Sequence, residues 1–106
     1  MIITTGETIP GHEIIMVQGM VRGNVVRARH IGSDIIAGLR TIVGGEVPEY
    51  TKLMAEAREQ AIDRMTREAR KLSADAIVGV RFTTSMIMRG SAEILVYGTA
   101  VRLHDR

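Results

Sequence analysis

The longest apolar segment of the chain, residues 13–29, has the alternation of a strand rather than the spacing of a helix. Both of its faces are apolar. One face carries Ile15, Val17, Val21 and Val25, and the other carries Ile14, Met16, Met20 and Val26. One unbroken strand of this length would be unusually long. We therefore expect Gly19 and Gly23 to mark a bend or a bulge.

The middle of the chain has the three- and four-residue spacing of amphipathic helices. A first helix is predicted over residues 33–43, with Ser33 as its cap and Gly44 after its end. A second helix is predicted from Pro48 to about Leu72, because proline suits a first helical turn. Its apolar stripe comprises Tyr50, Leu53, Met54, Ala57, Ala61, Met65, Ala69 and Leu72. The many alanines would let this helix lie close to the surface that it covers.

Two further strands are predicted over residues 76–88 and 92–103, joined by a hairpin turn at residues 89–91. In the first strand, one face comprises Val78, Val80, Phe82, Met86 and Met88. Its second, more polar face comprises Ile77, Gly79, Arg81, Thr83, Ser85 and Ile87. The last strand is apolar on both faces, with Ile94, Val96 and Ala100 against Leu95, Tyr97, Val101 and Leu103. This order of elements favours an α+β fold, with an antiparallel sheet and helices packed on one face.

That architecture predicts self-association. A chain of 106 residues is one domain, so residues 1–106 form a single unit. Its helices can cover only one face of the sheet, and the second apolar face would otherwise be an exposed patch. A second copy of the chain is the simplest cover. We therefore expect a homo-oligomer.

Composition narrows the possible classes of function. The sequence has no cysteine, which excludes disulfides and thiolate metal sites. No signal peptide and no apolar run of the ~20 residues that span a bilayer is evident, so we expect a cytoplasmic protein without a membrane partner. The net charge is only +2 and the aromatic residues are three. Nucleic acid is therefore an unfavoured partner.

A series of short motifs extends from the middle of the chain to its end: Ile42-Val43-Gly44-Gly45-Glu46, Tyr50-Thr51, Ala57-Arg58, Ala61, Arg64-Met65, Ala74-Asp75-Ala76-Ile77-Val78-Gly79-Val80-Arg81-Phe82, Glu93-Ile94 and Tyr97-Gly98-Thr99-Ala100-Val101. In combination they resemble the YbjQ family of small uncharacterised proteins, nearly end to end. The sequence departs from the family at Ser73, in a turn where the family usually has glycine.

The resemblance implies a dodecin-like β-α-β-β subunit in a closed ring, with a pentamer expected. It also implies that the short N-terminal strand helps to join subunits. The family often carries the label "putative heavy-metal-binding", but it has no established catalytic or metal residues that could be transferred. Flavin binding is not expected, because the chain has no tryptophan to stack on the cofactor.

The label directs attention to His30, His104, Met86 and Met88 as candidate metal ligands. The histidines are scattered and lack a ligand spacing on one element. Thioethers suit Cu(I), but methionine more often fills cores and interfaces. Exposed loop histidines and packing methionines are therefore the competing interpretation, unless an assembly brings ligands together from several chains.

Arg81 is the most informative single candidate, because it lies in mid-strand beside Thr83 and Ser85. A ring would repeat this set in every subunit as donors for an anion, a carboxylate or a phosphate. The alternative is an inter-subunit ion pair, for example with Glu93. A second candidate pair is Glu46 and Arg58, which could flank a ligand at a helix N-terminus or form a salt bridge that anchors the helix.

No set of nucleophile, base and orienting residue is evident, so no enzyme is predicted. The sequence favours a homo-oligomeric binding module that takes a metal ion or a small anionic ligand at subunit interfaces. The first alternative is a structural or interaction protein whose ring docks a protein partner. The second alternative is an uncharacterised enzyme that uses interface residues.

Overall fold

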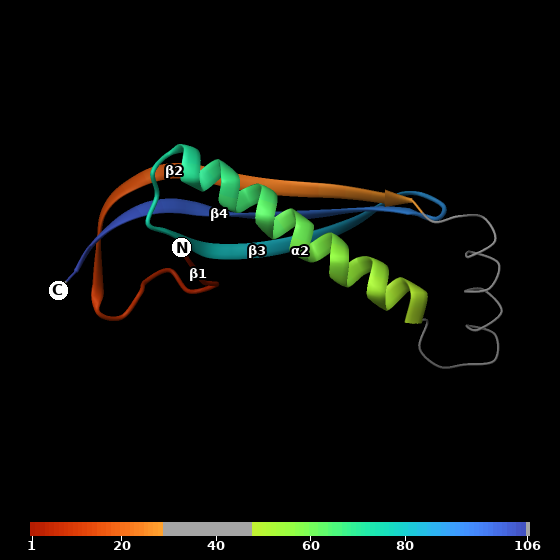
Figure 1. The fold of residues 1–106 in the computed structure, drawn as a ribbon, viewed down its shortest axis with the longest axis horizontal. Helices are drawn as coiled ribbons and strands as arrows, with labels where there is room; N and C mark the ends of the chain where they lie inside the picture. The colour runs from red at the N-terminus through yellow and green to blue at the C-terminus, as the bar shows by residue number, and fades with distance from the viewer. Residues whose placement is uncertain (29–47, 106) are drawn as a thin grey trace.

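The computed structural model of the chain describes residues 1–28 and 48–105. It contains β1 (Ile2–Ile3), β2 (His12–Ala28), α2 (Pro48–Lys71), β3 (Ala76–Met88) and β4 (Ser91–Asp105) (Figure 1). The helix predicted over residues 33–43 lies outside the described residues. The second predicted helix and the three long strands are confirmed, each within a few residues of its expected ends. Within the described ranges, no helix is long and apolar enough to cross a membrane.

The strands form one sheet in the order β1-β3-β4-β2. The three long strands are antiparallel, as expected, whereas the short β1 runs parallel to β3. Beyond β1, the Thr4 amide donates to the Ile77 carbonyl at 3.0 Å, and the Gly79 amide donates to the Gly6 carbonyl at 2.8 Å. The N-terminal segment thus covers the edge of β3 only as far as Val80, whose amide donates to the Thr4 carbonyl at 3.1 Å.

Helix α2 packs obliquely across one face of the sheet (Figure 1). Its buried residues Ala57, Ala61, Met65 and Ala69 meet a core from all three long strands. Close approach is possible because Gly23 has no side chain: a Cβ there would lie 2.1 Å from the Ala61 carbonyl oxygen. The predicted stripe and the role of its alanines are confirmed. Gly23, which we expected at a bend, instead makes room for the helix.

Two register shifts interrupt β2, between Ile14 and Met16 and between Val17 and Gly19. Gly19 has φ 121°, so the bulge expected there is confirmed. Side chains alternate between the two faces of a sheet every second residue, so each register shift moves the following side chains to the opposite face. Val17 is therefore exposed, whereas Val21 is buried under α2. The predicted grouping of Ile15 and Val17 with Val21 was wrong for this reason.

A further shift occurs in β3 between Val78 and Arg81, at Gly79 with φ 63°. As a result, Ile77 packs with Val80 in the core under α2, although alternation placed them on opposite faces. Val78 turns to the other side and packs with Ala76 and Val101. This second, smaller cluster is covered by residues before and within β2 and at the end of β4, namely Ile9, Ile14 and Leu103.

The far half of the β3–β4 hairpin extends beyond this cover. Every residue of β3 from position 81 to 88 is exposed, with Met86 at 82% and Met88 at 65%. The hairpin turn at residues 89–90 is confirmed, and Gly90 has φ 76°. The Cα radius of gyration is 17.4 Å, whereas a compact chain of this length has about 13 Å. The strands are therefore longer than the core that one chain can build around them.

Candidate functional site

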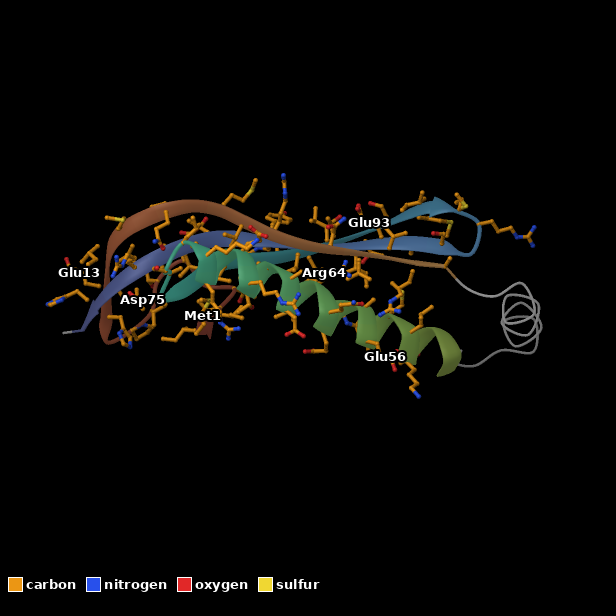
Figure 2. All side chains as sticks on the ribbon, turned by 45° about the horizontal axis from the view of Figure 1, so that its top comes forward. Met1, Glu13, Glu56, Arg64, Asp75 and Glu93 are labelled. Atoms are coloured by element: carbon orange, nitrogen blue, oxygen red, sulfur yellow. The ribbon has the colours of Figure 1, made fainter. Side chains whose placement is uncertain are left out.

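The sheet has a face turned away from α2, which we call the open face. Side chains alternate between the two faces along a strand, so a residue between two helix-facing neighbours is on the open face. Arg22 is such a residue, because Val21 and Gly23 both face α2. The same reasoning and the strand register give the full set: Met20, Arg22, Asn24 and Val26 of β2, Glu93, Leu95, Tyr97 and Thr99 of β4, and Arg81, Thr83 and Ser85 of β3. In Figure 2, Glu93 stands on this face, on the opposite side from α2.

A row of three side chains crosses the open face. Arg22 of β2 is directly opposite Tyr97 of β4, and Tyr97 is directly opposite Arg81 of β3. Two arginines on the outer strands therefore flank one tyrosine on the central strand. The next rows towards the hairpin are Asn24, Leu95 and Thr83, followed by Val26, Glu93 and Ser85. Arg81, Thr83 and Ser85 thus share a face, as the sequence predicted.

Arg81 is held in place by backbone carbonyl groups. Its Nη1 donates to the Thr5 carbonyl oxygen and to the Val80 carbonyl oxygen, both at 2.8 Å. These bonds tie the guanidinium to the end of the N-terminal segment and leave its Nε and Nη2 groups for other acceptors. Arginine with several donors in a planar fork suits an oxyanion. The geometry therefore provides an anchored donor group at the border between covered and uncovered sheet.

The acidic partner proposed for Arg81 is not beside it within the chain. Glu93 is opposite Ser85, four residues along β3 from Arg81, which corresponds to roughly 13 Å. The Glu93 carboxylate instead accepts a hydrogen bond from the Asn24 amide at 3.2 Å. An ion pair between Arg81 and an acid of another subunit stays a prediction.

The candidate metal ligands do not gather in one place. His104 is near the end of β4, whereas Met86 and Met88 pair with Ala92 and Ser91 at its start, roughly 40 Å away. A register shift between Met86 and Met88 also interrupts the alternation that placed them on one face. Two other candidates, His30 and Glu46, lie outside the described residues. Arg58 is exposed on α2.

A hollow at the end of the sheet is lined by His12, Asp75 and His104, with Ile2 and Leu103. One Asp75 carboxylate oxygen already accepts the Leu103 amide at 2.8 Å. Across the described ranges, no three His, Cys, Asp or Glu side chains form a group that could hold a metal ion. The described donors of a single chain therefore do not fit a metal centre.

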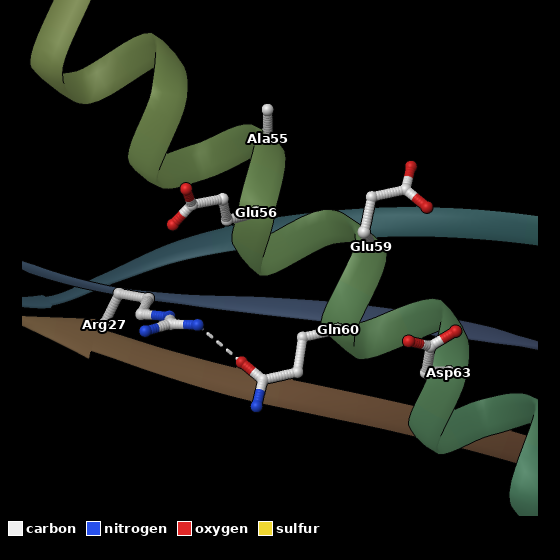
Figure 3. Close-up of a pocket in the computed structure, with 6 residues that line it drawn as sticks. All are labelled: Arg27, Ala55, Glu56, Glu59, Gln60 and Asp63. Atoms are coloured by element: carbon white, nitrogen blue, oxygen red, sulfur yellow. Dashed lines mark hydrogen bonds between the residues drawn. The ribbon is translucent and has the colours of Figure 1, made fainter.

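A second hollow lies beside α2 and is lined by Arg27, Ala55, Glu56, Glu59, Gln60 and Asp63 (Figure 3). The Arg27 Nη2 donates to the Gln60 side-chain oxygen at 2.6 Å, which connects the end of β2 to the helix. The carboxylates of Glu56, Glu59 and Asp63 point in different directions (Figure 3). This hollow is a charged helix surface, and its guanidinium serves the packing of β2 against α2.

Sequence reasoning did not single out Arg22 and Tyr97. Both residues stood on strands that were correctly predicted, but the sequence contains no direct signal of which residues face each other across strands. The register follows from long-range pairing and from the bulges in β2 and β3. An arginine within an otherwise apolar strand was the one available signal, and Arg22 and Arg81 share it.

Comparisons with known proteins agree with the motifs. The family model YbjQ, described as "Putative heavy-metal-binding", matches residues 1–104. A UPF0145 protein of Archaeoglobus fulgidus is 59% identical over 103 residues, which cover 97% of this chain and 95% of that protein. A UPF0145 protein of Methanosarcina acetivorans is 57% identical over 106 residues, which cover both chains completely.

One solved structure has the same fold. A DUF74-family protein of unknown function from Pediococcus pentosaceus superimposes with a TM-score of 0.68 over 98% of each chain, at 17% identity. At this identity the likeness concerns the fold, a four-stranded sheet with a helix on one face. Together, the match of the family model and the relatives at well over half identity show that the chain belongs to the YbjQ family.

Proposed function

We propose that this protein is a homo-oligomeric binding module that takes a small anionic ligand on the open face, at or near a subunit interface. The observation that carries the proposal is Arg81: an exposed guanidinium, anchored on two carbonyl groups, on a sheet face that α2 does not cover. Thr83 and Ser85 continue the same strand face with hydroxyl groups.

Self-association is supported by the apolar surface that the described part of the chain leaves uncovered. Large apolar side chains are exposed on both halves of the sheet, including Val17, Met20, Val26, Met86 and Met88. Such a surface marks an interaction site in a folded protein. A ring of dodecin-like subunits, with five copies, is the assembly that the family resemblance led us to expect.

An anion is favoured over a metal ion because of the donors that the fold brings together. The open face combines two arginines with hydroxyl groups, whereas His104 is near the end of β4 and Met86 and Met88 of β3 pair with its start. Guanidinium groups form strong, bidentate hydrogen bonds with carboxylate and phosphate. The described residues of one chain form no group of three metal ligands.

The Arg81→Ala variant tests this function. We expect it to lose binding of a probe such as phenyl phosphate by at least about tenfold, because a hydrogen bond to a charged group contributes ~1.5–3 kcal/mol. The oligomer should survive, and both quantities can be measured by isothermal titration calorimetry and native mass spectrometry. Arg102→Ala is the matched control, since Arg102 is exposed on the neighbouring strand β4 and faces the other side of the sheet.

A structural or interaction protein is the second candidate, and the exposed methionines of the hairpin favour it. In that case Arg81 would join subunits instead of binding a ligand. Arg81→Ala would then dissociate the oligomer, and the wild-type protein would bind none of the small anions tested. The two candidates therefore predict opposite results for the same variant.

A further inference from the structure

The row of Arg22, Tyr97 and Arg81 offers a ligand more binding groups than Arg81 alone. Neighbouring strands are about 4.8 Å apart, so the two arginine backbones are roughly 10 Å apart with Tyr97 between them. Both side chains start on the same face of the sheet, but Nη1 of Arg81 is held at the edge of β3 that faces the N-terminal segment. A group bound above Tyr97 would therefore meet Arg22 on one side and the remaining Nε and Nη2 donors of Arg81 on the other.

The two arginines differ in how they are held. Arg81 is fixed at the border of the N-terminal segment by the Thr5 and Val80 carbonyls. Arg22 makes no hydrogen bond or ion pair with the residues that the structure describes, although a hollow beside it contains Asn24, Glu68 and Lys71. No described residue thus occupies its donors. The guanidinium of Arg81 is thus a donor group in a fixed position, and that of Arg22 is a donor group that can adjust its position.

The ring between them adds a flat apolar surface. Tyr97 is 36% exposed, and its neighbour on the same strand face, Leu95, is half-buried. An aromatic group of a ligand can stack on such a ring with a gain of about 0.5–1.5 kcal/mol. The arrangement suits a ligand that has an oxyanion attached to a planar ring better than a bare inorganic ion.

The acidic side chain on the open face is distant from the two arginines and already accepts a hydrogen bond. The nearest acid of the row's own strand face is Glu93, roughly 13 Å along β4 from Tyr97. Its carboxylate accepts the Asn24 amide. Because exposed charges more than a Debye length of about 8–10 Å apart are largely screened, Glu93 offsets little of the charge of the two arginines. Glu68 borders the hollow beside Arg22, but its carboxylate is paired with Lys71 at 3.2 Å.

We propose that Arg22, Tyr97 and Arg81 form one two-armed site for the oxyanion group of a small aromatic ligand, a phosphate ester or a carboxylate. Each arginine donates to the oxyanion from one side, and the ring of the ligand stacks on Tyr97. This proposal rests on the proposed function and gives it a second guanidinium, a stacking residue and a class of ligand.

Calorimetric titration of the oligomer with phenyl phosphate, benzoate and inorganic phosphate tests the proposal. Arg22→Ala and Arg81→Ala should each weaken phenyl phosphate binding by at least about tenfold, and Arg102→Ala should leave it unchanged. Tyr97→Ala should remove the preference for phenyl phosphate over inorganic phosphate. Comparison of benzoate with phenyl phosphate distinguishes a carboxylate from a phosphate ligand.

The arginine-to-lysine variants keep the charge but lose the planar fork. Arg22→Lys and Arg81→Lys should therefore bind between wild type and the alanine variants, and they guard against a fold that is disturbed by loss of the Thr5 contact. Wild-type binding by Arg22→Ala, with loss in Arg81→Ala, would overturn the two-armed site and keep the proposed function. Absence of binding by the wild-type protein would overturn both.

Discussion

Ser73 occupies a backbone conformation that usually belongs to glycine. It follows α2 with φ 59°, and the Ser73 amide donates to the Arg70 carbonyl at 2.9 Å. The Ala74 amide donates to the Ala69 carbonyl at 3.1 Å, so the two bonds form a Schellman motif. A side chain in the left-handed region costs roughly 1–2 kcal/mol. The resemblance identified this position as a departure from the family, and the geometry explains why glycine is usual there.

Ser73→Gly is therefore expected to stabilise the protein by about 1 kcal/mol, because it relieves the strain at positive φ. Ser73→Val should have the opposite effect, since a branched Cβ is poorly tolerated there. Ser91→Gly, at the start of β4, is the matched control and should not stabilise. Urea unfolding at one fixed protein concentration measures all three. A loss of stability in Ser73→Gly would contradict the assigned helix end.

At the scale of elements, the β3–β4 hairpin combines a buried base with an exposed end. Near the base, Ile77, Val80, Val96 and Ala100 pack under α2. At the far end, Phe82, Met86, Ile87 and Met88 are all exposed, and neither α2 nor the N-terminal segment covers the outer edge of β3 beyond Val80. A long apolar edge of this kind is a site for association or aggregation unless it is covered.

Met86→Glu tests the role of that end. If copies of the chain pack on it, a buried charge without a partner should weaken the assembly by tenfold or more in dissociation constant. Sedimentation velocity over a dilution series measures the change. Arg67→Glu on the exposed surface of α2 adds the same charged group roughly 20 Å along the helix from Leu53 and Met54, which border the hairpin end, and it should leave the assembly intact. An unchanged assembly in Met86→Glu would exclude the hairpin end from the subunit interface.

Helix α2 could be predicted almost to the residue, because its 3.6-residue period, its proline start and its polar outer side depend on local sequence. The facing of the strands could not be predicted fully. Gly79 shifts the period of β3, so that Ile77 rather than Val78 joins the core. The candidate site could be predicted only in part, because its residues lie on several strands. Arg81, Thr83 and Ser85 follow Gly79 in one unbroken alternation, whereas Arg22 and Tyr97 join them only through the register between strands.

At the scale of the whole molecule, the chain is elongated, with principal extents of 55 × 23 × 16 Å. Among the described residues, α2 covers one side of the sheet, and the small cluster around Ala76, Val78 and Val101 covers part of the other. The open face and the far hairpin are therefore the surfaces that residues 1–28 and 48–105 leave uncovered. Self-association would complete the core and would also place the Arg22–Tyr97–Arg81 rows of several copies in one assembly.

Native mass spectrometry of the untagged protein is the most direct test of this account. One chain has a mass of 11.6 kDa. We expect one closed assembly at a fixed multiple of that mass, with five copies, that persists on dilution and gains phenyl phosphate in proportion to its number of subunits. A protein that remains at 11.6 kDa at micromolar concentration would contradict the assembly and, with it, the account of the open face.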